Sequence, residues 1–442
     1  MKITKELLNK FEQNFKSKKE NILLMNAITK NGINNASFNN EILRKHNNLY
    51  SHETKNGSIT NQKSSGRCWI FASLNMARIS AMKKFDIEDI ELSQSYLHFF
   101  DKIEKANTFL ENIIQYGLDL DFNDPKFKYF MDGPIDDGGF WEWFLALINK
   151  YGIVPKALMP DTATSINTHQ FLEVLNYKAK EYAMILRNAH KKGADINKLR
   201  ELKEQGLNDI YSICVKALGM PPKSFNFQYK DKDKKTQKLS NVTPVEFYEM
   251  ILGNSLNEKV NLVSDAREIY PYGKVLSSEY FNSVYESANN KQLNVPMEEL
   301  IKASRDSILD GVPVPHACDV GKMHDRKLGI MDTEVFDYAN TLVNNTMTKA
   351  DRMNYFLTMP THLMSFTGVD LDENKNPIKW KVENSWGTDN GFKGFFSMSN
   401  EWFIEYNFQC VVDKKYVDPK YLKGLEEEPI ILPMGDPLAY LH

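Results

Sequence analysis

One cysteine of this chain stands where a turn-forming stretch meets an apolar stretch. Residues 61–71 read NQKSSGRCWIF, so Cys68 follows a Ser-Ser-Gly-Arg run and precedes Trp69. A thiol is a nucleophile only as thiolate, and the positive end of a helix dipole or a nearby imidazolium lowers its pKa. Taken alone, a cysteine before an apolar helix is more often an inert, packed residue. Cys68 is therefore a candidate nucleophile only if the chain also supplies a base.

Three histidines, His316, His324 and His362, lie in or beside the strand-rich half of the chain and are candidates for that role. His362 begins an apolar stretch of strand character, and Asn384 stands at the end of the next such stretch. Neighbouring antiparallel strands can place two such residues side by side, and the Asn384 amide oxygen could then accept the imidazole N–H and orient the ring. His316 also lies near predicted strands, but no Asn or Asp follows it in a comparable position. We predict a Cys68/His362/Asn384 triad, with Trp386 shielding the His–Asn hydrogen bond from water.

Acyl transfer also needs donors for the oxyanion of the tetrahedral intermediate. The backbone N–H of Cys68 at a helix start is one candidate, and the side-chain amide of Gln62, upstream in the same loop, is the second. Each such donor typically contributes about 3 kcal/mol to transition-state stabilisation.

The elements that carry these residues change character along the chain. Apolar residues recur at helical spacing from Cys68 to Phe85, and Ser64-Ser65-Gly66 supplies the turn and start chemistry before them. Short stretches rich in Val, Thr and Phe, separated by Gly, Asn and Asp, follow after about residue 300 and indicate antiparallel strands. Helices first and strands later predict an α+β protein with two lobes rather than a parallel α/β sheet. Further helices are expected around 93–102, 141–145, 168–192 and 195–218, and strands around 362–369, 377–384 and 394–398.

Composition excludes several classes of protein. The chain has 442 residues, of which 42% are hydrophobic and 26% charged, with a formal net charge of -3. This is the balance of an ordinary soluble globular protein and favours neither nucleic acid nor a membrane surface as a partner. The run from Lys230 to Lys235 interleaves lysine with aspartate and reads as a solvated loop.

The cysteines and the N-terminus bear on the compartment. The four cysteines are far apart and form no CxxC spacing, which favours a reducing cytoplasm over a disulfide framework. The first twenty residues lack the apolar core of a signal peptide, and the chain contains no run of about eighteen apolar residues. We therefore expect a cytoplasmic protein without a membrane segment.

Together these motifs resemble the papain-type cysteine peptidases, through Gln62, the stretch from Ser65 to Trp69, His362 and the stretch Asn384-Ser385-Trp386-Gly387. Two departures are informative: Ser65 replaces a disulfide cysteine of the secreted enzymes, and the cysteine and histidine are unusually far apart. In both departures the chain resembles one branch of these peptidases, the cytosolic bleomycin hydrolase and aminopeptidase C family. Further matching segments are 91–97, 137–139, 318–322, 361–362, 429–433 and 436–438.

The resemblance implies a papain-like two-lobed fold with large helical insertions. We expect an N-terminal helical extension (1–50), a helical lobe with the nucleophile (51–160), an inserted helical arm with oligomer contacts (161–270), a β-rich lobe with His and Asn (271–427) and a tail in the active-site cleft (428–442). The resemblance also implies a homohexameric enzyme that releases N-terminal residues from peptides with a free N-terminus. No cofactor and no metal are expected.

Substrate-binding residues are implied by the same resemblance. Gly138 and Gly139 would pair with the substrate backbone, although a tight turn before a helix is the simpler interpretation. The terminal carboxylate, here on His442, would meet the substrate ammonium group. The chain ends Ala-Tyr-Leu-His, which differs from the small-residue ending usual in the family.

Two other functions remain open from the sequence. A papain-like endopeptidase would cleave without needing a free α-amine. A binding or scaffold protein could hold nucleic acid on the lysine-rich arm, and its binding would then depend on salt concentration. The triad argues against a purely structural protein.

Overall fold

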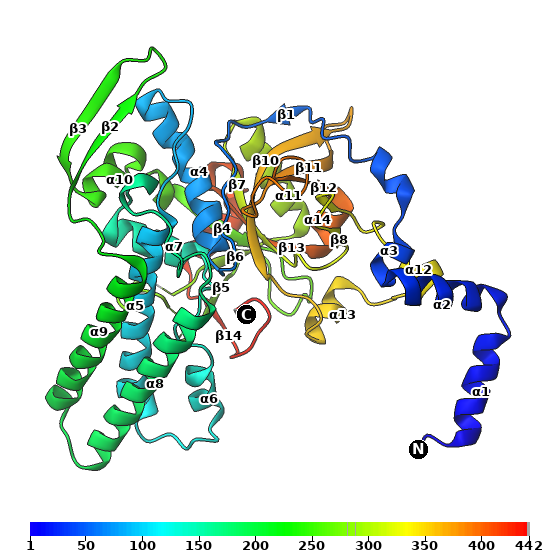
Figure 1. Cartoon of the computed structure of the whole chain (residues 1–442), viewed down its shortest axis with the longest axis horizontal. Helices are drawn as coiled ribbons and strands as arrows, with labels where there is room; N and C mark the ends of the chain where they lie inside the picture. Colours follow the sequence, from blue (N-terminus) through cyan, green and yellow to red (C-terminus); the bar gives the residue numbers. More distant parts are fainter. Residues whose placement is uncertain (281, 288, 440–442) are drawn as a thin grey trace.

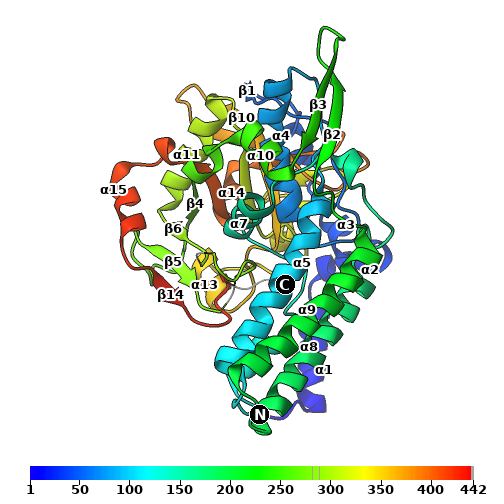
Figure 2. The same cartoon turned by 90° about the vertical axis from the view of Figure 1, so that its left-hand side faces the viewer.

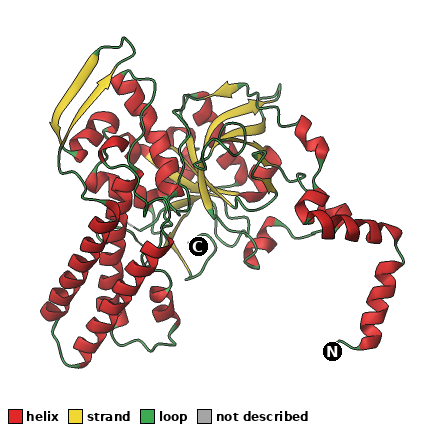
Figure 3. Ribbon diagram, viewed as in Figure 1, coloured by secondary structure: helices red, strands yellow, loops and turns green. Residues whose placement is uncertain are grey.

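The computed structural model describes residues 1–280, 282–287 and 289–439. A helical lobe and a sheet lobe lie side by side, and an N-terminal arm extends away from the sheet lobe (Figures 1 and 3). Each lobe has its own buried hydrophobic cluster, one built mainly from helices and the other mainly from strands. The observed class is therefore α+β with two lobes, as the sequence predicts.

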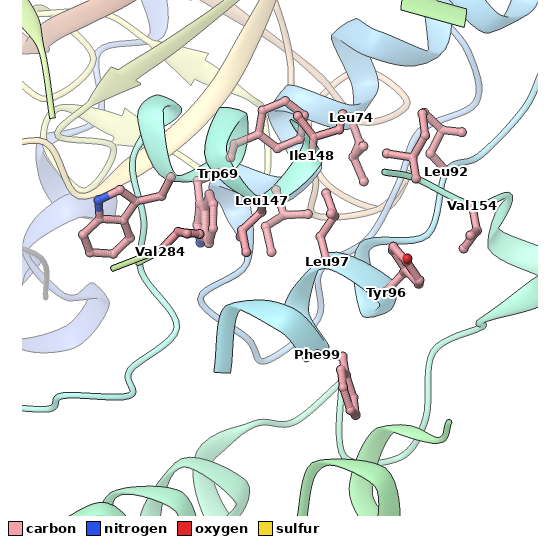
Figure 4. Packing of buried hydrophobic residues seen from close by; sticks show 14 of the residues in the cluster. Trp69, Leu74, Leu92, Tyr96, Leu97, Phe99, Leu147, Ile148, Val154 and Val284 are labelled. Carbon is pink, nitrogen blue, oxygen red and sulfur yellow. The ribbon is translucent and has the colours of Figure 1, made fainter. Parts of the chain in front are cut away.

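The helical lobe is built around one buried helix, α4 (Cys68–Phe85), whose bounds are those expected from its apolar spacing. The side chains of α4 are buried on nearly all faces of the helix, which is typical of a helix inside a core. Trp69 and Leu74 of α4 pack with neighbouring helices in Figure 4. The other helices of this lobe are α5 (Gln94–Asn112), α6 (Pro125–Met131), α7 (Trp141–Tyr151) and α10 (Pro244–Leu252).

The inserted arm consists of two long helices and a hairpin. α8 (His169–Lys191) and α9 (Ile196–Leu218) run side by side (Figures 1 and 2), and Asp195 caps α9 by accepting from the Lys198 N–H. β2 (Phe225–Lys230) and β3 (Thr236–Val242) follow, with the charged run at their turn. Residues 259–263, which we assigned to the arm from sequence, instead form β4 of the main sheet. The sheet lobe therefore begins before residue 270.

One long sheet forms the second lobe. Its strand order is β14-β5-β6-β4-β13-β7-β10-β11-β12-β9-β8, and β1 pairs with β10. At its centre β10 lies antiparallel to both β7 and β11, with His362 opposite Cys318 and Ser365 opposite Glu383. Strand bounds are β1 (His52–Glu53), β4 (Lys259–Val263), β5 (Val275–Ser278), β6 (Gln292–Asn294), β7 (Val314–Cys318), β8 (His324–Asp325), β9 (Ile330–Met331), β10 (His362–Leu371), β11 (Pro377–Glu383), β12 (Phe395–Ser399), β13 (Asn407–Asp413) and β14 (Ile430–Leu432).

Helix α4 joins the two lobes, because it packs along β10. The Ser365 hydroxyl donates to the Ala72 carbonyl oxygen at 3.2 Å, and Arg78 forms a buried ion pair with Glu383 at 2.7 Å. Breaking such a buried pair leaves an uncompensated charge, which costs about 3 to 5 kcal/mol. The contact therefore fixes the start of α4 relative to the strand ends of the sheet.

The remaining helices lie around the sheet or beyond it. α1 (Lys5–Lys16) and α2 (Lys19–Asn31) form the N-terminal arm, and neither contains a buried residue. Within the described ranges, no helix combines the length and the apolar run that crossing a bilayer requires. The other helices are α3 (Ile33–Ser37), α11 (Met297–Leu309), α12 (Tyr338–Thr341), α13 (Lys349–Asn354), α14 (Asn400–Tyr406) and α15 (Pro419–Leu422).

Candidate active site

Cys68 is the first residue of α4 and lies where the two lobes meet. Its side chain is mostly buried, with 8% of the residue exposed, whereas Cys214, Cys318 and Cys410 are fully buried. All four thiols are free. The position at a helix N-terminus places the positive end of the helix dipole at the thiol, as the sequence indicates.

His362 and Asn384 meet at the ends of β10 and β11. Nε2 of His362 lies 3.0 Å from Oδ1 of Asn384, and the indole of Trp386 covers the imidazole with ring centroids 4.9 Å apart. Oδ1 of Asn384 also accepts from the Ser385 N–H at 2.7 Å, which holds the amide in this orientation. The imidazole therefore donates Nε2–H to Asn384 and leaves Nδ1 as its other proton-accepting atom.

Burial disfavours an isolated charge on either member of the candidate pair. It raises the pKa of the Cys68 thiol to about 11, although the backbone N–H groups of Leu363 and Trp69 oppose this. It also lowers the pKa of His362 to about 4, although the bond to Asn384 opposes this. Proton transfer from thiol to imidazole creates both charges together, and each then offsets the desolvation of the other. Each charge by itself is therefore disfavoured in this buried position.

The Gln62 loop is tied to the strand end that carries Asn384. The Gln62 N–H donates to the Ser385 carbonyl oxygen at 2.8 Å, and the Ser385 hydroxyl donates to Oε1 of Gln62 at 2.7 Å. Nε2 of Gln62 donates one proton to the Ser65 carbonyl oxygen at 2.6 Å and keeps a second one. Ser385, which sequence reasoning left without a role, thus fixes the orientation of the Gln62 amide.

Gly138 and Gly139 lie in the loop that leads through Phe140 into α7. A Cβ on Gly139 would lie 2.3 Å from Cε2 of Trp69, so only glycine allows the backbone to approach the indole this closely. The Gly138 carbonyl oxygen accepts a hydrogen bond from Nζ of Lys105 at 2.6 Å. The pair therefore lies beside the residue that follows Cys68, which fits a substrate-binding strip and also gives Gly139 a packing role.

Sequence reasoning missed a buried ionic cluster behind the cysteine. Asp101, Lys102, Lys105 and Asp137 are all buried, and ion pairs of 2.9 to 3.1 Å connect them. Asp137 was part of a matching segment, but no local signal in the sequence shows that residues of α5 contact it. This contact exists only because α5 packs behind the loop that precedes α7.

His316 has a partner that the sequence analysis did not anticipate. Its Nδ1 lies 2.8 Å from Oδ1 of Asn407 at the start of β13, and its ring stacks on Phe366 with centroids 3.8 Å apart. Burial lowers the pKa of His316 to about 3. An Asn partner therefore does exist, and His316 is a packed core residue whose ring is held between the strands.

The C-terminal tail is anchored up to the last described residue. Arg267 donates to both carboxylate oxygens of Asp436 at 3.0 and 3.1 Å, and Leu438 and Ala439 are buried against residues of β4, β5 and β13. Figure 1 shows this red segment between the long helices and α13. His442, predicted to carry the substrate-binding carboxylate, lies outside the described residues.

Comparisons with known proteins agree with this geometry. The sequence profile of the peptidase C1-like family matches residues 2–439. Aminopeptidase C of Listeria monocytogenes is 37% identical over 440 residues, 99% of each chain, and bleomycin hydrolase of Homo sapiens is 38% identical over 392 residues, 87% of this chain and 86% of that protein. The crystal structure of pepW from Lactobacillus rhamnosis has a TM-score of 0.97 and 34% identity, covering 99% of both chains.

A cysteine at a helix start in one lobe, next to a histidine and an asparagine at strand ends of the other, is the arrangement of a two-lobed, papain-like cysteine peptidase. The long helical arm, α8 and α9, packs on α5 of the helical lobe. The chain belongs to the peptidase C1-like family.

Proposed function

We propose that this chain is a cysteine aminopeptidase that removes N-terminal residues from peptides through a Cys68/His362/Asn384 triad. The observation that carries the proposal is the pairing of His362 with Asn384 beside Cys68. Of the four cysteines, Cys68 is the one that is not fully buried. A relative called aminopeptidase C is matched over 99% of this chain and one called bleomycin hydrolase over 87%, and the first name supports an exopeptidase over an endopeptidase.

The chemistry follows from the positions of these groups. Sγ of Cys68 attacks the carbonyl carbon of the first peptide bond, while the Cys68 N–H and the free proton of the Gln62 amide stabilise the oxyanion. The C–N bond breaks as His362 gives its proton to the leaving amine, and a thioester remains on Cys68. His362 then takes a proton from water, whose oxygen attacks the thioester carbon. The C–S bond breaks, Cys68 leaves as thiolate beside the protonated His362, and the N-terminal residue is released with a free carboxyl group.

The tail is proposed to limit access to this site. The described part is held by the Arg267–Asp436 ion pair and by the bond from Nε2 of Gln292 to the Leu438 carbonyl oxygen at 3.3 Å. A carboxylate that the tail presents in the cleft would attract the ammonium group of a substrate. A filled cleft on that side leaves no room for residues preceding the N-terminal one, and cleavage would then require a free α-amine.

We further propose that the enzyme is a cytoplasmic homohexamer without a cofactor. The N-terminal arm supports assembly, because Leu8, Phe11 and Phe15 form an exposed apolar stripe on α1 at helical spacing. Such a stripe on a helix without buried residues is typical of a contact with another subunit.

The free-amine requirement gives a direct test. Wild-type protein should hydrolyse aminoacyl-naphthylamides and should leave the N-acetylated forms intact, while Cys68→Ala should lose at least about 10³-fold in rate and stay folded. Naphthylamine release measured by fluorescence, with circular dichroism for folding, provides both readouts. Equal rates on the free and acetylated substrates would instead favour an endopeptidase, and full activity of Cys68→Ala would exclude this cysteine as the nucleophile.

A further inference from the structure

The carboxylate of Asp137 connects segments that the chain brings together from distant positions. Its Oδ2 accepts from the backbone N–H of Gly66 at 2.9 Å and from the Thr168 hydroxyl at 2.6 Å. Its Oδ1 lies 2.8 Å from Nε2 of His98 and 2.9 Å from Nζ of Lys102. One side chain thus binds the loop two residues before Cys68, the inserted arm and helix α5.

The backbone around Asp137 is held to the same place. Its carbonyl oxygen accepts from Nε1 of Trp69 at 2.8 Å. Lys105 donates to the carbonyl oxygens of Asp136 at 2.5 Å and Gly138 at 2.6 Å, and its Nζ also lies 5.7 Å from the Trp69 ring centroid. Gly66 before Cys68 and Trp69 after it are therefore both bonded to Asp137, and Gly138 is bonded to Lys105 of the same cluster.

The cluster is electrically balanced and keeps Asp137 ionised. Burial alone would raise the pKa of Asp137, but Lys102 holds it well below the usual range. Burial lowers the pKa of His98 to about 4, so this ring is neutral at pH 7 and donates Nε2–H to Asp137. Asp101 pairs with both lysines at 3.1 Å. Two acids and two lysines thus compensate one another, and the carboxylate can accept from Gly66 and Thr168 as an anion.

The packing at Gly66 shows how closely the loop depends on this side chain. A Cβ on Gly66 would lie 2.7 Å from Cβ of Asp137. The loop therefore contacts Asp137 with its Cα as well as with its N–H. A displacement of Asp137 would be transmitted to the turn that sets the direction of the Cys68 backbone N–H.

We propose that Asp137 is a positioning residue for the reaction: its buried carboxylate, balanced by Lys102, aligns the Gly66 turn and the Gly138–Gly139 segment with respect to Cys68. This inference rests on the proposed function of Cys68 and adds a residue that itself contacts no reacting atom. The bond to Gly66 is the step that couples the cluster to catalysis. Misplacement of a catalytic group by about 1 Å costs on the order of 100-fold in rate.

The test compares two variants that both remove the charges of the pair. Asp137→Leu/Lys102→Met and Asp137→Asn/Lys102→Met each delete one anion and one cation, so neither buries an uncompensated charge. They differ in the acceptor, because only asparagine offers an oxygen to the Gly66 N–H. We expect the leucine variant to lose about 100-fold in kcat/KM and mainly in kcat, and the asparagine variant to stay within about fivefold of wild type.

A third variant and a control separate positioning from stability. Gly66→Ala leaves every charge in place but pushes Asp137 away, and it should reproduce the loss seen with the leucine variant. Asp332→Asn alters another buried carboxylate, which lies 3.1 Å from Nε2 of His46 in the sheet lobe. It should lower the melting temperature and leave kcat/KM unchanged. Activities are compared per folded molecule, as determined by circular dichroism at the assay temperature.

The rate of Cys68 alkylation by iodoacetamide provides a readout that needs no substrate. We expect slower alkylation in Asp137→Leu/Lys102→Met than in Asp137→Asn/Lys102→Met. Mass spectrometry identifies Cys68 as the alkylated residue. This difference tests Asp137 even if wild-type protein cleaves no aminoacyl-naphthylamide, a result that would overturn the proposed function alone. Equal alkylation rates and equal kcat/KM in the two double variants would overturn the positioning role.

Discussion

At the scale of single residues, the site consists of groups that depend on each other for their charge. Neither the Cys68 thiol nor the His362 imidazole favours its charged form alone in this buried position. Asn384 stabilises the imidazolium through its hydrogen bond, and Arg326, whose guanidinium lies 4.3 Å from the Trp386 ring centroid, disfavours it by charge repulsion. We therefore expect these two neighbours to shift the pH range of activity in opposite directions.

These two neighbours predict opposite shifts of the alkaline limb of the pH profile. That limb reports loss of the imidazolium proton. Asn384→Ala removes a bond that raises the pKa of His362, so the limb should move to lower pH by about one unit. Arg326→Gln removes a charge that lowers this pKa, so the limb should move to higher pH. Profiles of kcat/KM from pH 5 to 10 measure both shifts, and shifts of the same sign in the two variants would contradict the assignment of His362.

At the scale of elements, the strand ends hold the candidate site together, and we propose that the tail limits what reaches the cysteine. β10 and β11 bring His362 and Asn384 together, and the 384–387 segment holds the Gln62 loop through Ser385. On the other side, β14 pairs in parallel with β5 and directs the tail toward Asp436. Arg267 forms bidentate bonds with Asp436 and is also bound to Asp265.

The ion pair at Asp436 predicts a change in specificity. Asp436→Asn keeps an acceptor for the Leu438 N–H and leaves Arg267 paired with Asp265, so it should release the tail without burying a lone charge. The ratio of cleavage rates for N-acetylated and free aminoacyl-naphthylamides should rise at least about tenfold.

The matched control is Asp413→Asn, which breaks the 2.8 Å ion pair between Lys259 of β4 and Asp413 of β13. It removes a carboxylate from the same sheet without touching the tail, and the ratio should stay at the wild-type value. An unchanged ratio in Asp436→Asn would show that this ion pair does not control access.

At the scale of the whole molecule, the chain has a feature that a single copy leaves unexplained. The N-terminal arm extends from the sheet lobe (Figure 1), and Phe11 on α1 is 53% exposed. An amphipathic helix held away from its own core gains stability by burying its apolar face elsewhere. A second copy of the chain is the partner we propose.

Charges on this face should therefore dissociate the assembly. Leu8→Glu/Phe11→Glu should shift the sedimentation mass from an oligomer toward the 51.1 kDa chain. Asn9→Glu/Gln13→Glu adds the same charges on the other side of α1 and should leave the mass unchanged. A wild-type protein that sediments as a monomer would contradict the proposed homohexamer and the role of this arm.

Local patterns in the sequence determined much of this protein. Helical spacing placed α4 at Cys68–Phe85, and strand character placed His362 and Asn384 at the ends of consecutive strands. Periodicity and end signals report which residues share a face and where an element stops, and both are local properties. The family motifs then related Cys68, His362 and Asn384 to one chemistry.

Contacts between distant segments could only be found in the tertiary structure. Asn407 pairs with His316, Ser385 orients Gln62, Asp137 joins the cysteine loop to α5 and the arm, and β4 joins the main sheet. No local pattern encodes such partners, because a buried polar group takes whichever partner the packing of other elements brings within hydrogen-bond distance. The sequence by itself thus determined which residues could react, and only the packing of the two lobes decided how they are held.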